Sequence, residues 1–382
     1  MQKKILLLSS LLSMAYATNG DLMIATDTKS MGMGGVGIAI PFGAISSINN
    51  PALLSYTKNK EFAINATAFF PTIQTKTEFI RDRDYQDSDS TFYLIPSMAY
   101  SMPIDSRWSV GVGMWGVAGM GVDFSDAPSG SGLFGMQTDL MIMHIATPVS
   151  YRFDDFSLGV APILQVGMLD IEYQALTHHH PYDKEIDANV GVKFGGVYDW
   201  HNGLRVGIVY QTPISMTYDS SEVTAPDLKL EQPQEYGIGF SYQSGVHMVA
   251  FDYKRIDWDK ADGYKAFGWK AQNVYALGYE YSGIDRYKLR VGYNYAKAPV
   301  DTDDAQAFQN YLNLLGFPAT ATRHYTMGVS YEYDKDIVID TAFVYAPTQT
   351  TQGTILKTDL GDMLIYNKHK EISLTIQIDY KF

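Results

Sequence analysis

The carboxyl-terminal stretch decides the fold, and residues 369–382 read HKEISLTIQIDYKF. From Ile372 to Phe382 every second side chain is apolar, and Ser, Thr, Gln, Asp and Lys fill the positions between. Successive side chains of a β-strand point to opposite faces, so this period of two predicts a strand with one apolar and one polar face.

The same alternation recurs along the chain and predicts fourteen strands. Their ranges are 60–70, 92–103, 107–116, 139–152, 155–173, 187–200, 203–217, 233–244, 246–258, 270–283, 286–297, 323–334, 336–347 and 369–382. Short connections alternate with long ones, and the long ones are 71–91, 117–138, 174–186, 218–232, 259–269, 298–322 and 348–368. An even number of strands with alternating loop lengths is typical of outer-membrane barrels. The sequence therefore predicts an all-β fold, a fourteen-stranded antiparallel transmembrane β-barrel over residues 60–382.

Composition agrees with a membrane protein and excludes several other classes. The chain has 28 Tyr and no Cys, and its net charge is −13 without a basic block. Tyrosine suits a membrane–water boundary. The acidic balance argues against nucleic-acid binding, and the missing Cys excludes disulfides and thiolate metal sites. Aromatic residues crowd the predicted strand ends, as an aromatic girdle requires: Trp108, Trp115, Trp200, Trp258, Trp269, Tyr295, Tyr333, Tyr345 and Tyr380. A soluble β-sandwich is the alternative, because alternation alone does not separate the two.

The amino terminus has the features of a secretory signal peptide over residues 1–17. Lys3 and Lys4 form a positive region, residues 5–14 are almost continuously apolar, and Ala15-Tyr16-Ala17 is a small-residue cleavage site. Ten apolar residues are too short to span a bilayer. We expect cleavage after Ala17 and export of the mature chain.

Residues 18–59 precede the first strand and predict a hatch that plugs the barrel lumen. Gly32, Gly34, Gly35 and Gly37 make this segment glycine-rich, and Asn50, Pro51 and Ala52 follow as a compact turn. Pro51 fixes φ and Asn50 can hydrogen-bond locally, so the turn predicts a rigid corner that holds the hatch. The spacing of the glycines matches a dinucleotide fingerprint only formally, because no strand precedes them.

Several motifs resemble the FadL/TodX family of outer-membrane transporters for long-chain fatty acids and aromatic hydrocarbons. They are NPALL at 50–54, QPQEYGIG at 232–239, DYKRIDW at 252–258, RVGYNYAKAPV at 290–300 and HYTMGVSY at 324–331. The resemblance implies a monomeric, hatch-plugged barrel in the outer membrane of a Gram-negative bacterium. It also implies passive uptake of hydrophobic compounds, with outer-membrane lipid and the barrel-assembly machinery as partners. A structural or adhesive barrel and a general diffusion porin are the alternatives.

The connection 174–186 is shorter than the corresponding loop of that family, and it contains His178–His180. Apolar residues gather instead in two other outer connections, of which 303–317 has helical spacing. They are the candidate ligand contacts: Met120, Phe124, Leu133, Phe134, Met136, Phe308, Leu312 and Leu315.

The third predicted strand contains Gly111, Gly113 and Gly116. Glycines weaken a strand interior and often mark a bend, so a lateral gap for ligand release is one interpretation. The other is that these glycines make room for hatch side chains.

Three cations, Lys193, Lys254 and Arg290, fall on the polar phase of their strands and should face the lumen. They either pair with carboxylates such as Asp252 and Asp340 or capture an anionic headgroup in transit. No catalytic motif, nucleotide loop or calcium loop occurs, so we expect neither an enzyme nor a cofactor. We also expect no metal, because adjacent His178–His180 lack a tetrahedral frame. Phe382 is the candidate assembly signal, although a strand can also end in Phe by chance.

Overall fold

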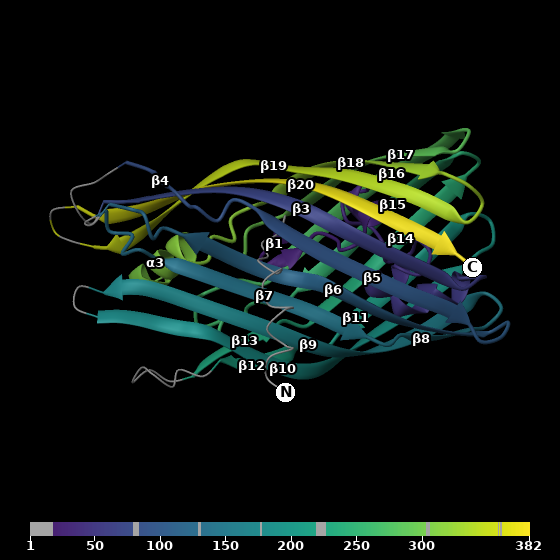
Figure 1. The fold of residues 1–382 in the computed structure, drawn as a ribbon, viewed down its shortest axis with the longest axis horizontal. Helices are drawn as coiled ribbons and strands as arrows, with labels where there is room; N and C mark the ends of the chain where they lie inside the picture. Colours follow the sequence, from purple (N-terminus) through teal and green to yellow (C-terminus); the bar gives the residue numbers. More distant parts are fainter. Residues whose placement is uncertain are drawn as a thin grey trace, which may run out of the picture.

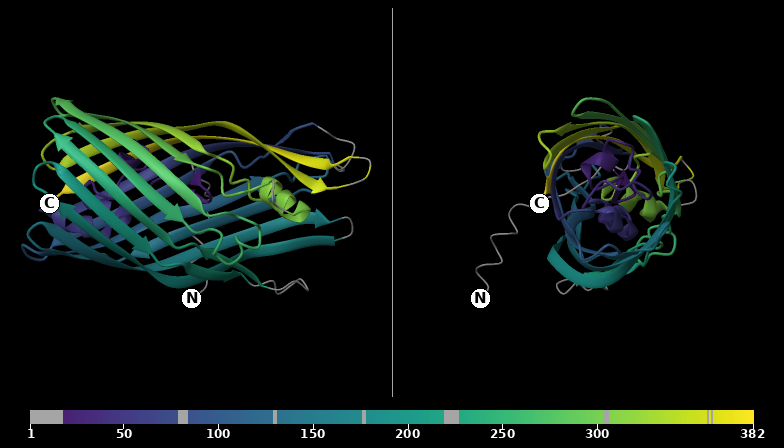
Figure 2. Two further views of the ribbon diagram at one scale, coloured as in Figure 1. Left: turned by 180° about the vertical axis from the view of Figure 1, so that it is seen from behind. Right: turned by 90° about the vertical axis from the view of Figure 1, so that its right-hand side faces the viewer.

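The computed structural model describes residues 18–78, 84–128, 131–175, 178–218, 227–302, 306–357, 359 and 361–382. The signal peptide predicted over 1–17 lies outside this part. Strands wrap around a lumen that holds the amino-terminal segment (Figures 1 and 2). None of the helices in the described ranges has the length and apolarity needed to cross a bilayer.

The wall contains fourteen antiparallel strands, and the predicted number is confirmed. They are β3 (Glu61–Thr77), β5 (Tyr93–Pro103), β6 (Trp108–Asp123), β7 (Gln137–Ala146) with β8 (Val149–Arg152), β9 (Phe156–Ala175), β10 (His178–Asp199), β11 (Leu204–Gln211), β14 (Glu235–Ser244), β15 (His247–Ile256), β16 (Gln272–Ile284), β17 (Tyr287–Ala296), β18 (Arg323–Glu332), β19 (Ile337–Leu356) and β20 (Met363–Lys381). Between β11 and β14, β12 (Ile214–Tyr218) and β13 (Leu228–Gln232) pair with each other in a separate two-stranded sheet. A short β4 (Gln86–Asp87) pairs with β3. Pairing of β20 with β3 over Glu61–Thr77 closes the barrel.

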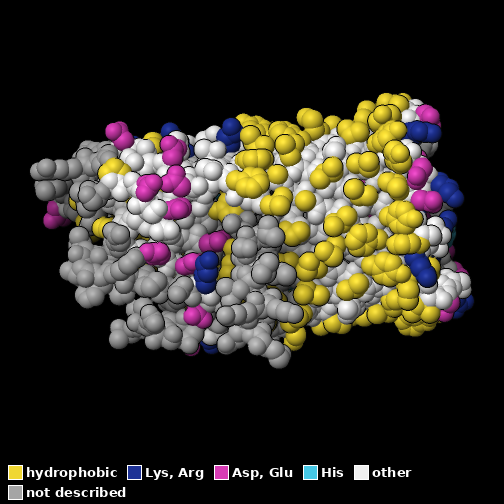
Figure 3. Space-filling view, viewed as in Figure 1, with side chains coloured by type: hydrophobic (Ala, Val, Ile, Leu, Met, Phe, Trp, Pro, Cys, Tyr) yellow, Lys and Arg dark blue, Asp and Glu magenta, His cyan; other side chains and the backbone are white. Residues whose placement is uncertain are grey.

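The apolar face of each strand points outward. In β20 the side chains of Leu374, Ile376 and Ile378 are exposed, whereas Thr375 and Gln377 are buried toward the lumen. Apolar side chains cover the half of the wall that carries the carboxyl terminus, and charged and polar groups gather on the other half (Figure 3). This inside-out arrangement excludes the sandwich, because a soluble protein hides its apolar face.

Two connections that the sequence predicts as long loops, 174–186 and 348–368, are largely strand. β9 continues to Ala175 and β10 begins at His178. In the same way, β19 continues to Leu356 and β20 begins at Met363. In both connections the alternation of apolar and polar residues is lost, although Ile365 and Asn367 of β20 are buried. Backbone pairing nevertheless continues there. The prediction of long irregular loops was therefore wrong at these two hairpins.

Residues 18–57 lie inside the barrel (Figure 2). They contain β1 (Thr18–Asn19), β2 (Leu22–Met23), α1 (Thr28–Met31), α2 (Ser46–Asn49) and the 3₁₀ helix η1 (Pro51–Tyr56). The wall end with short turns and the carboxyl terminus is the periplasmic end, and the end with long hairpins is the outer end. At the outer end, α3 (Ala307–Leu315) forms within the stretch that the spacing predicts as helical.

Candidate functional site

The hatch glycines lie where the hatch backbone touches the wall. Gly34 and Gly35 have φ of 73° and 89°, which side-chain-bearing residues rarely adopt. Gly34 N donates to Thr326 Oγ1 at 2.8 Å and its carbonyl accepts from Asn294 Nδ2 at 3.0 Å. A Cβ on Gly292 of β17 would overlap the nitrogen of Gly34, so only glycine permits this approach.

A single carboxylate of the wall holds the next part of the hatch. Asp252 Oδ2 accepts from the backbone nitrogens of Gly37 and Ile38 at 2.8 and 2.9 Å. Asp252 is buried on β15. Two backbone donors on one carboxylate oxygen fix both the position and the direction of this turn.

Asn50 forms the corner that the sequence predicts. Its Nδ2 donates to the carbonyls of Ile38, Gly196 and Ile208 at 2.8, 3.3 and 3.4 Å, and its Oδ1 accepts from Ala52 N at 3.0 Å. The first contact is within the hatch and the next two are with β10 and β11. Pro51 and Ala52 begin η1 and are buried. The side chain of Asn50 therefore joins two parts of the hatch to the wall.

The three predicted lumen cations differ in their surroundings. Arg290 is nearly fully buried and pairs with Glu280 Oε2 at 2.7 Å and with Asp340 Oδ1 at 3.3 Å. Lys193 donates to the carbonyl of Ile48 at 3.0 Å. Within the described ranges, neither Lys193 nor Lys254 forms an ion pair with Asp252, which serves the hatch instead.

The sequence did not single out Lys29, the hatch cation that completes this network. Its Nζ lies 2.6 Å from Asp379 Oδ2 and 3.6 Å from Asp340 Oδ2, and it donates to the carbonyl of Phe42 at 3.2 Å. Burial acts to lower the pKa of Lys29, but the two carboxylates outweigh it and raise the pKa, so the amine stays charged. The charge ties α1 to β19 and β20.

Above the hatch, apolar side chains from the wall, the hatch and the outer connections form one buried group, which we name the outer apolar cluster. Its members include Leu22, Ile73, Met120, Phe124, Leu133, Met136, Met216, Leu230, Trp258, Tyr264, Trp269, Leu314, Leu315 and Phe317. Five of the candidate ligand contacts belong to it. Phe134 and Leu312 are half-buried nearby, and Phe134 contacts Tyr311 of α3 with ring centroids 6.3 Å apart. The side chain of Phe308 lies outside the described part.

The predicted aromatic girdle is only partly correct. Trp108 and Trp200 are exposed on the wall, as a girdle requires, whereas Trp115, Trp258 and Trp269 are buried inside. Trp258, Tyr264 and Trp269 pack with ring centroids 4.7 to 5.1 Å apart in the outer apolar cluster. Position at a strand end does not tell which face of the wall a ring occupies, so the sequence missed these core residues.

Asp21 links the start of the hatch to this cluster. Its Oδ2 accepts from Gln232 Nε2 at 3.0 Å and from the hydroxyl of Tyr264, and the carboxyl is fully buried. Burial raises the pKa of Asp21 to about 7, although the hydrogen bonds from Tyr264 and Gln232 act to lower it. A carboxyl that titrates near neutrality therefore lies between the hatch and the outer cluster.

The hydrogen-bond ladder between β5 and β6 is interrupted, and we name the interrupted part the β5–β6 window. The ladder between these strands ends at Ser97 and Trp115, and residues 93–96 of β5 pair with β3 alone. Toward the outer end, the segment that precedes β5 contacts the end of β6, where Asp89 N donates to the carbonyl of Asp123 at 2.8 Å. Of the three glycines predicted to line a gap, Gly116 lies at the window, whereas Gly111 and Gly113 are paired below it.

The hatch lies against the inner side of this window. Leu22 of β2 pairs with Ala118 of β6, and Gly119 N donates to the carbonyl of Asp21 at 3.0 Å. A narrow cavity beside it is lined by Thr18, Gly20, Phe69, Pro71, Ile73, Gly119, Met120, Gly121, Pro318, Ala319 and His369. Pro96 was the available sequence signal, because a residue without an N–H weakens a ladder.

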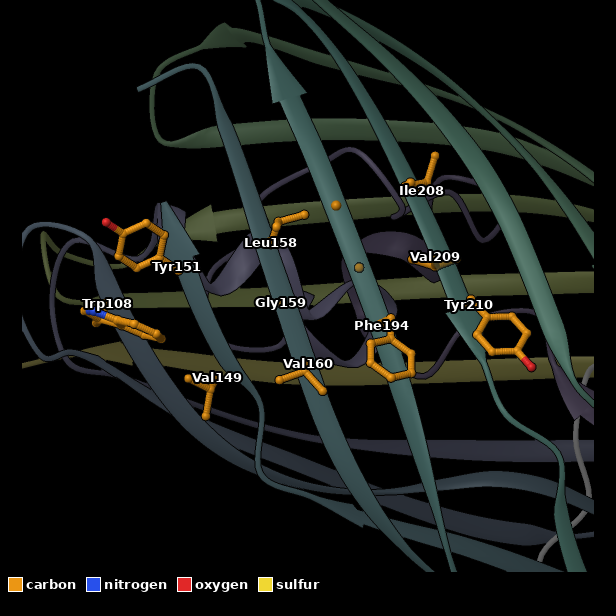
Figure 4. Close-up of a pocket in the computed structure, with 12 residues that line it drawn as sticks. Trp108, Val149, Tyr151, Leu158, Gly159, Val160, Phe194, Ile208, Val209 and Tyr210 are labelled. Atoms are coloured by element: carbon orange, nitrogen blue, oxygen red, sulfur yellow. The ribbon is translucent and has the colours of Figure 1, made fainter. Parts of the chain in front are cut away.

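A larger groove of about 500 Å³ lies on the outside of the wall, across β8 to β11 (Figure 4). Trp108, Leu158, Phe194 and Ile208 are exposed around it, so the groove belongs to the lipid-facing belt. Gly159, Gly195 and Gly196 also line the groove, and as glycines they have no side chain to fill it. Asn50 and Ala52 lie behind Gly195 and Gly159, on the lumen side.

Two remaining candidates lie at opposite ends of the wall. His178–His180 begin β10, and their side chains lie outside the described part. Among the described residues, no cluster of His, Asp or Glu is arranged to hold a metal ion. Phe382 is 67% exposed, contacts the rings of Tyr100 and Tyr380, and donates its backbone N–H to the carbonyl of Lys60 at 2.9 Å.

Comparisons with known proteins agree with this architecture. The family of outer membrane protein transport proteins, OMPP1/FadL/TodX, matches residues 11–264. A 47 kDa outer membrane protein of Pasteurella multocida (strain Pm70) is 22% identical over 363 residues, which cover 80% of this chain and 82% of that protein.

Two solved structures share the fold. A Pseudomonas aeruginosa FadL homologue superposes with a TM-score of 0.76 at 14% identity, covering 95% of this chain and 100% of the other. The P. putida toluene transporter TodX superposes with a TM-score of 0.71 at 17% identity, covering 94% of this chain and 99% of the other. The family that the motifs predict and the outer-membrane location are confirmed. The chain belongs to the OMPP1/FadL/TodX family of outer membrane transport proteins.

Proposed function

We propose that this outer-membrane protein takes up hydrophobic compounds passively, either long-chain fatty acids or aromatic or aliphatic hydrocarbons. The outer apolar cluster supports the capture step, because burying apolar surface stabilises a complex by roughly 25 cal/mol per Å². Five of the sequence-predicted ligand contacts, including Phe124 and Met136, lie in this cluster. TodX, which has the same fold, is described as a toluene transporter.

The proposed route leaves the lumen sideways through the β5–β6 window into the bilayer. The observation that carries it is the position of Leu22, which pairs with Ala118 where β5 no longer does. Phe69, Ile73 and Met120 line the cavity on the inner side, so an apolar molecule would meet apolar surface up to the wall. A route straight down would instead cross the charged network of Lys29, Arg290 and their carboxylates.

The same proposal assigns transport and not catalysis to the chain, with the monomer as the working unit. A structural or adhesive barrel would leave the lumen shut, and a general diffusion porin would conduct ions steadily. Uptake and conductance measured on one preparation of purified protein distinguish these alternatives.

The test uses proteoliposomes loaded with the purified chain and, in parallel, planar bilayers. We expect labelled toluene or oleate to enter proteoliposomes faster than protein-free liposomes, with no large steady conductance. The matched control is protein carrying the Leu22–Ala118 cross-link described in the Discussion. Uptake equal to that of protein-free liposomes favours the adhesive barrel, and a large steady conductance favours the porin; either result contradicts the proposal.

A further inference from the structure

The first residue after the predicted cleavage site lies on a buried carboxylate. Thr18 N donates to Glu371 Oε2 at 3.3 Å, and Thr18 Oγ1 donates to Glu371 Oε1 at 3.4 Å. Thr18 is 4% exposed and Glu371 is fully buried on β20. Both oxygens of one carboxylate therefore face one hatch residue.

Glu371 has no fixed positive partner among the described residues. Its ion-pair neighbours are His324 Nε2 at 3.1 Å and His369 Nε2 at 3.4 Å, and an imidazole is charged only when protonated. His369 Nδ1 is engaged by the carbonyl of Pro318 at 2.9 Å. A buried carboxylate without a permanent cation is costly, so this position calls for a positive charge.

Cleavage of the signal peptide would supply this positive charge at the backbone nitrogen of Thr18. Hydrolysis of the Ala17–Thr18 amide consumes one water, leaves a carboxylate on Ala17 and frees the amine of Thr18. This amine takes up a proton at neutral pH, since an α-amino group has a pKa of about 7.7–8.0. The amide has one N–H and no charge, whereas the ammonium has three donors and a full charge.

We propose that signal-peptide cleavage creates the ligand of Glu371, namely the α-ammonium of Thr18, and that the resulting ion pair fastens the start of the hatch. β1 pairs with β2 through Thr18 and Met23, and Leu22 of β2 pairs with Ala118. The ion pair thus ties β20 to the β5–β6 window across the lumen. The plug is completed only in the processed protein. This inference rests on cleavage after Ala17 and is independent of the transported compound.

The test measures the reactivity of the amino terminus in the folded, purified outer-membrane protein. Intact mass first establishes that the chain begins at Thr18. 2-Pyridinecarboxaldehyde, which reacts with free α-amines, is then added and labelling is followed by mass spectrometry. We expect Glu371→Gln to accelerate labelling roughly tenfold or more over wild type, the factor expected for losing one charge-assisted hydrogen bond.

Two further variants keep the test decisive. Glu280→Gln removes another buried carboxylate, the partner of Arg290, and should label like wild type. One glycine inserted between Ala17 and Thr18 moves the ammonium to the new residue while Thr18 keeps its N–H. This insertion variant should be labelled as fast as Glu371→Gln, and it tests the proposal by itself if Glu371→Gln does not assemble. Equal labelling of wild type and both altered proteins, acceleration by Glu280→Gln, or a mature terminus other than Thr18 overturns the proposal.

Discussion

Gly195 of β10 and Asn50 of the hatch fit so closely that a Cβ at position 195 would overlap Asn50 Oδ1. The neighbouring residue on the same strand, Gly196, accepts from Asn50 Nδ2 through its carbonyl at 3.3 Å. The wall therefore holds the corner of the hatch with backbone groups, and a side chain on this face of β10 would push the corner away.

Gly195→Ala is expected to loosen the hatch and alter uptake without unfolding the barrel. Displacement of Asn50 breaks bonds to β10 and β11, each worth about 1 kcal/mol net. Hydrogen exchange of residues 36–54 measures the loosening, and heat-modifiable migration reports the barrel. Gly196→Ala is the control, because its Cβ would lie 3.3 Å from Ile208 Cγ1 on the outer face. Equal exchange in both variants would contradict the docking role.

A disulfide between Leu22→Cys and Ala118→Cys should block uptake until it is reduced. These residues are directly paired, and opposed residues in antiparallel strands have Cα separations of about 4.5–5.5 Å, which a disulfide can bridge. The link would keep β2 in the β5–β6 window. The native chain has no Cys to interfere.

The control for this cross-link joins β5 to β6 below the window, at Met98→Cys and Met114→Cys, which are also paired. Oxidised control protein should transport at the rate of the reduced form. Lateral release is wrong if the oxidised Leu22–Ala118 protein transports as fast as its reduced form.

Docking of the hatch start should weaken as pH rises from about 4 to 7. The pKa of Asp21 is about 7 in the folded chain, against about 3.9 when unfolded, so the docked state binds the extra proton in this range. Burial is the main cause of this raised pKa; the hydrogen bonds from Tyr264 and Gln232 oppose it, and Glu235 adds to it. Protection of residues 22–25 against hydrogen exchange, corrected for intrinsic rates, measures the effect. Asp21→Asn should be insensitive to pH over the same range, and a retained pH dependence would exclude Asp21 as the cause.

Arg290→Met should destabilise the barrel by about 3–5 kcal/mol, because it removes the guanidinium from two buried carboxylates, Glu280 and Asp340. Denaturant titration of the heat-modifiable form in detergent measures the change. Lys288→Met is the control, since the pair of Lys288 with Glu332 is exposed and worth at most about 1 kcal/mol. Similar losses in the two variants would show that burial of the Arg290 pair is unimportant.

Phe382→Ala should reduce the amount of assembled barrel in the outer membrane, while Phe382→Tyr should not. The side chain is exposed, and the backbone bond to Lys60 is retained in both variants. Quantifying heat-modifiable protein in isolated membranes tests this. Wild-type levels of the alanine variant would remove Phe382 from the assembly signal.

The sequence predicted the membrane part of the wall well, because alternation there reflects lipid on one face and a filled lumen on the other. It failed beyond the bilayer, where residues 348–356 and 363–368 lack the alternation of apolar and polar side chains although the strands remain paired. Contacts between distant parts, such as Thr18 with Glu371, leave no local pattern. Gly111 and Gly113, which the sequence suggests for a lateral gap, are paired with β5, and the interruption of pairing lies next to Pro96 instead.

The apolar belt covers only part of the length of the wall, and this determines how far the strands extend beyond the membrane. A strand of 20 residues such as β19 spans about 50 Å along the barrel axis at the usual tilt, whereas the apolar band of such barrels is about 25 Å tall. Roughly half of β19 therefore extends beyond the hydrocarbon. On the face that Figure 3 shows, charged side chains lie on that half of the wall. We therefore expect α3, at the outer end, to lie in water beyond the hydrocarbon, where a sparingly soluble molecule would first meet the protein.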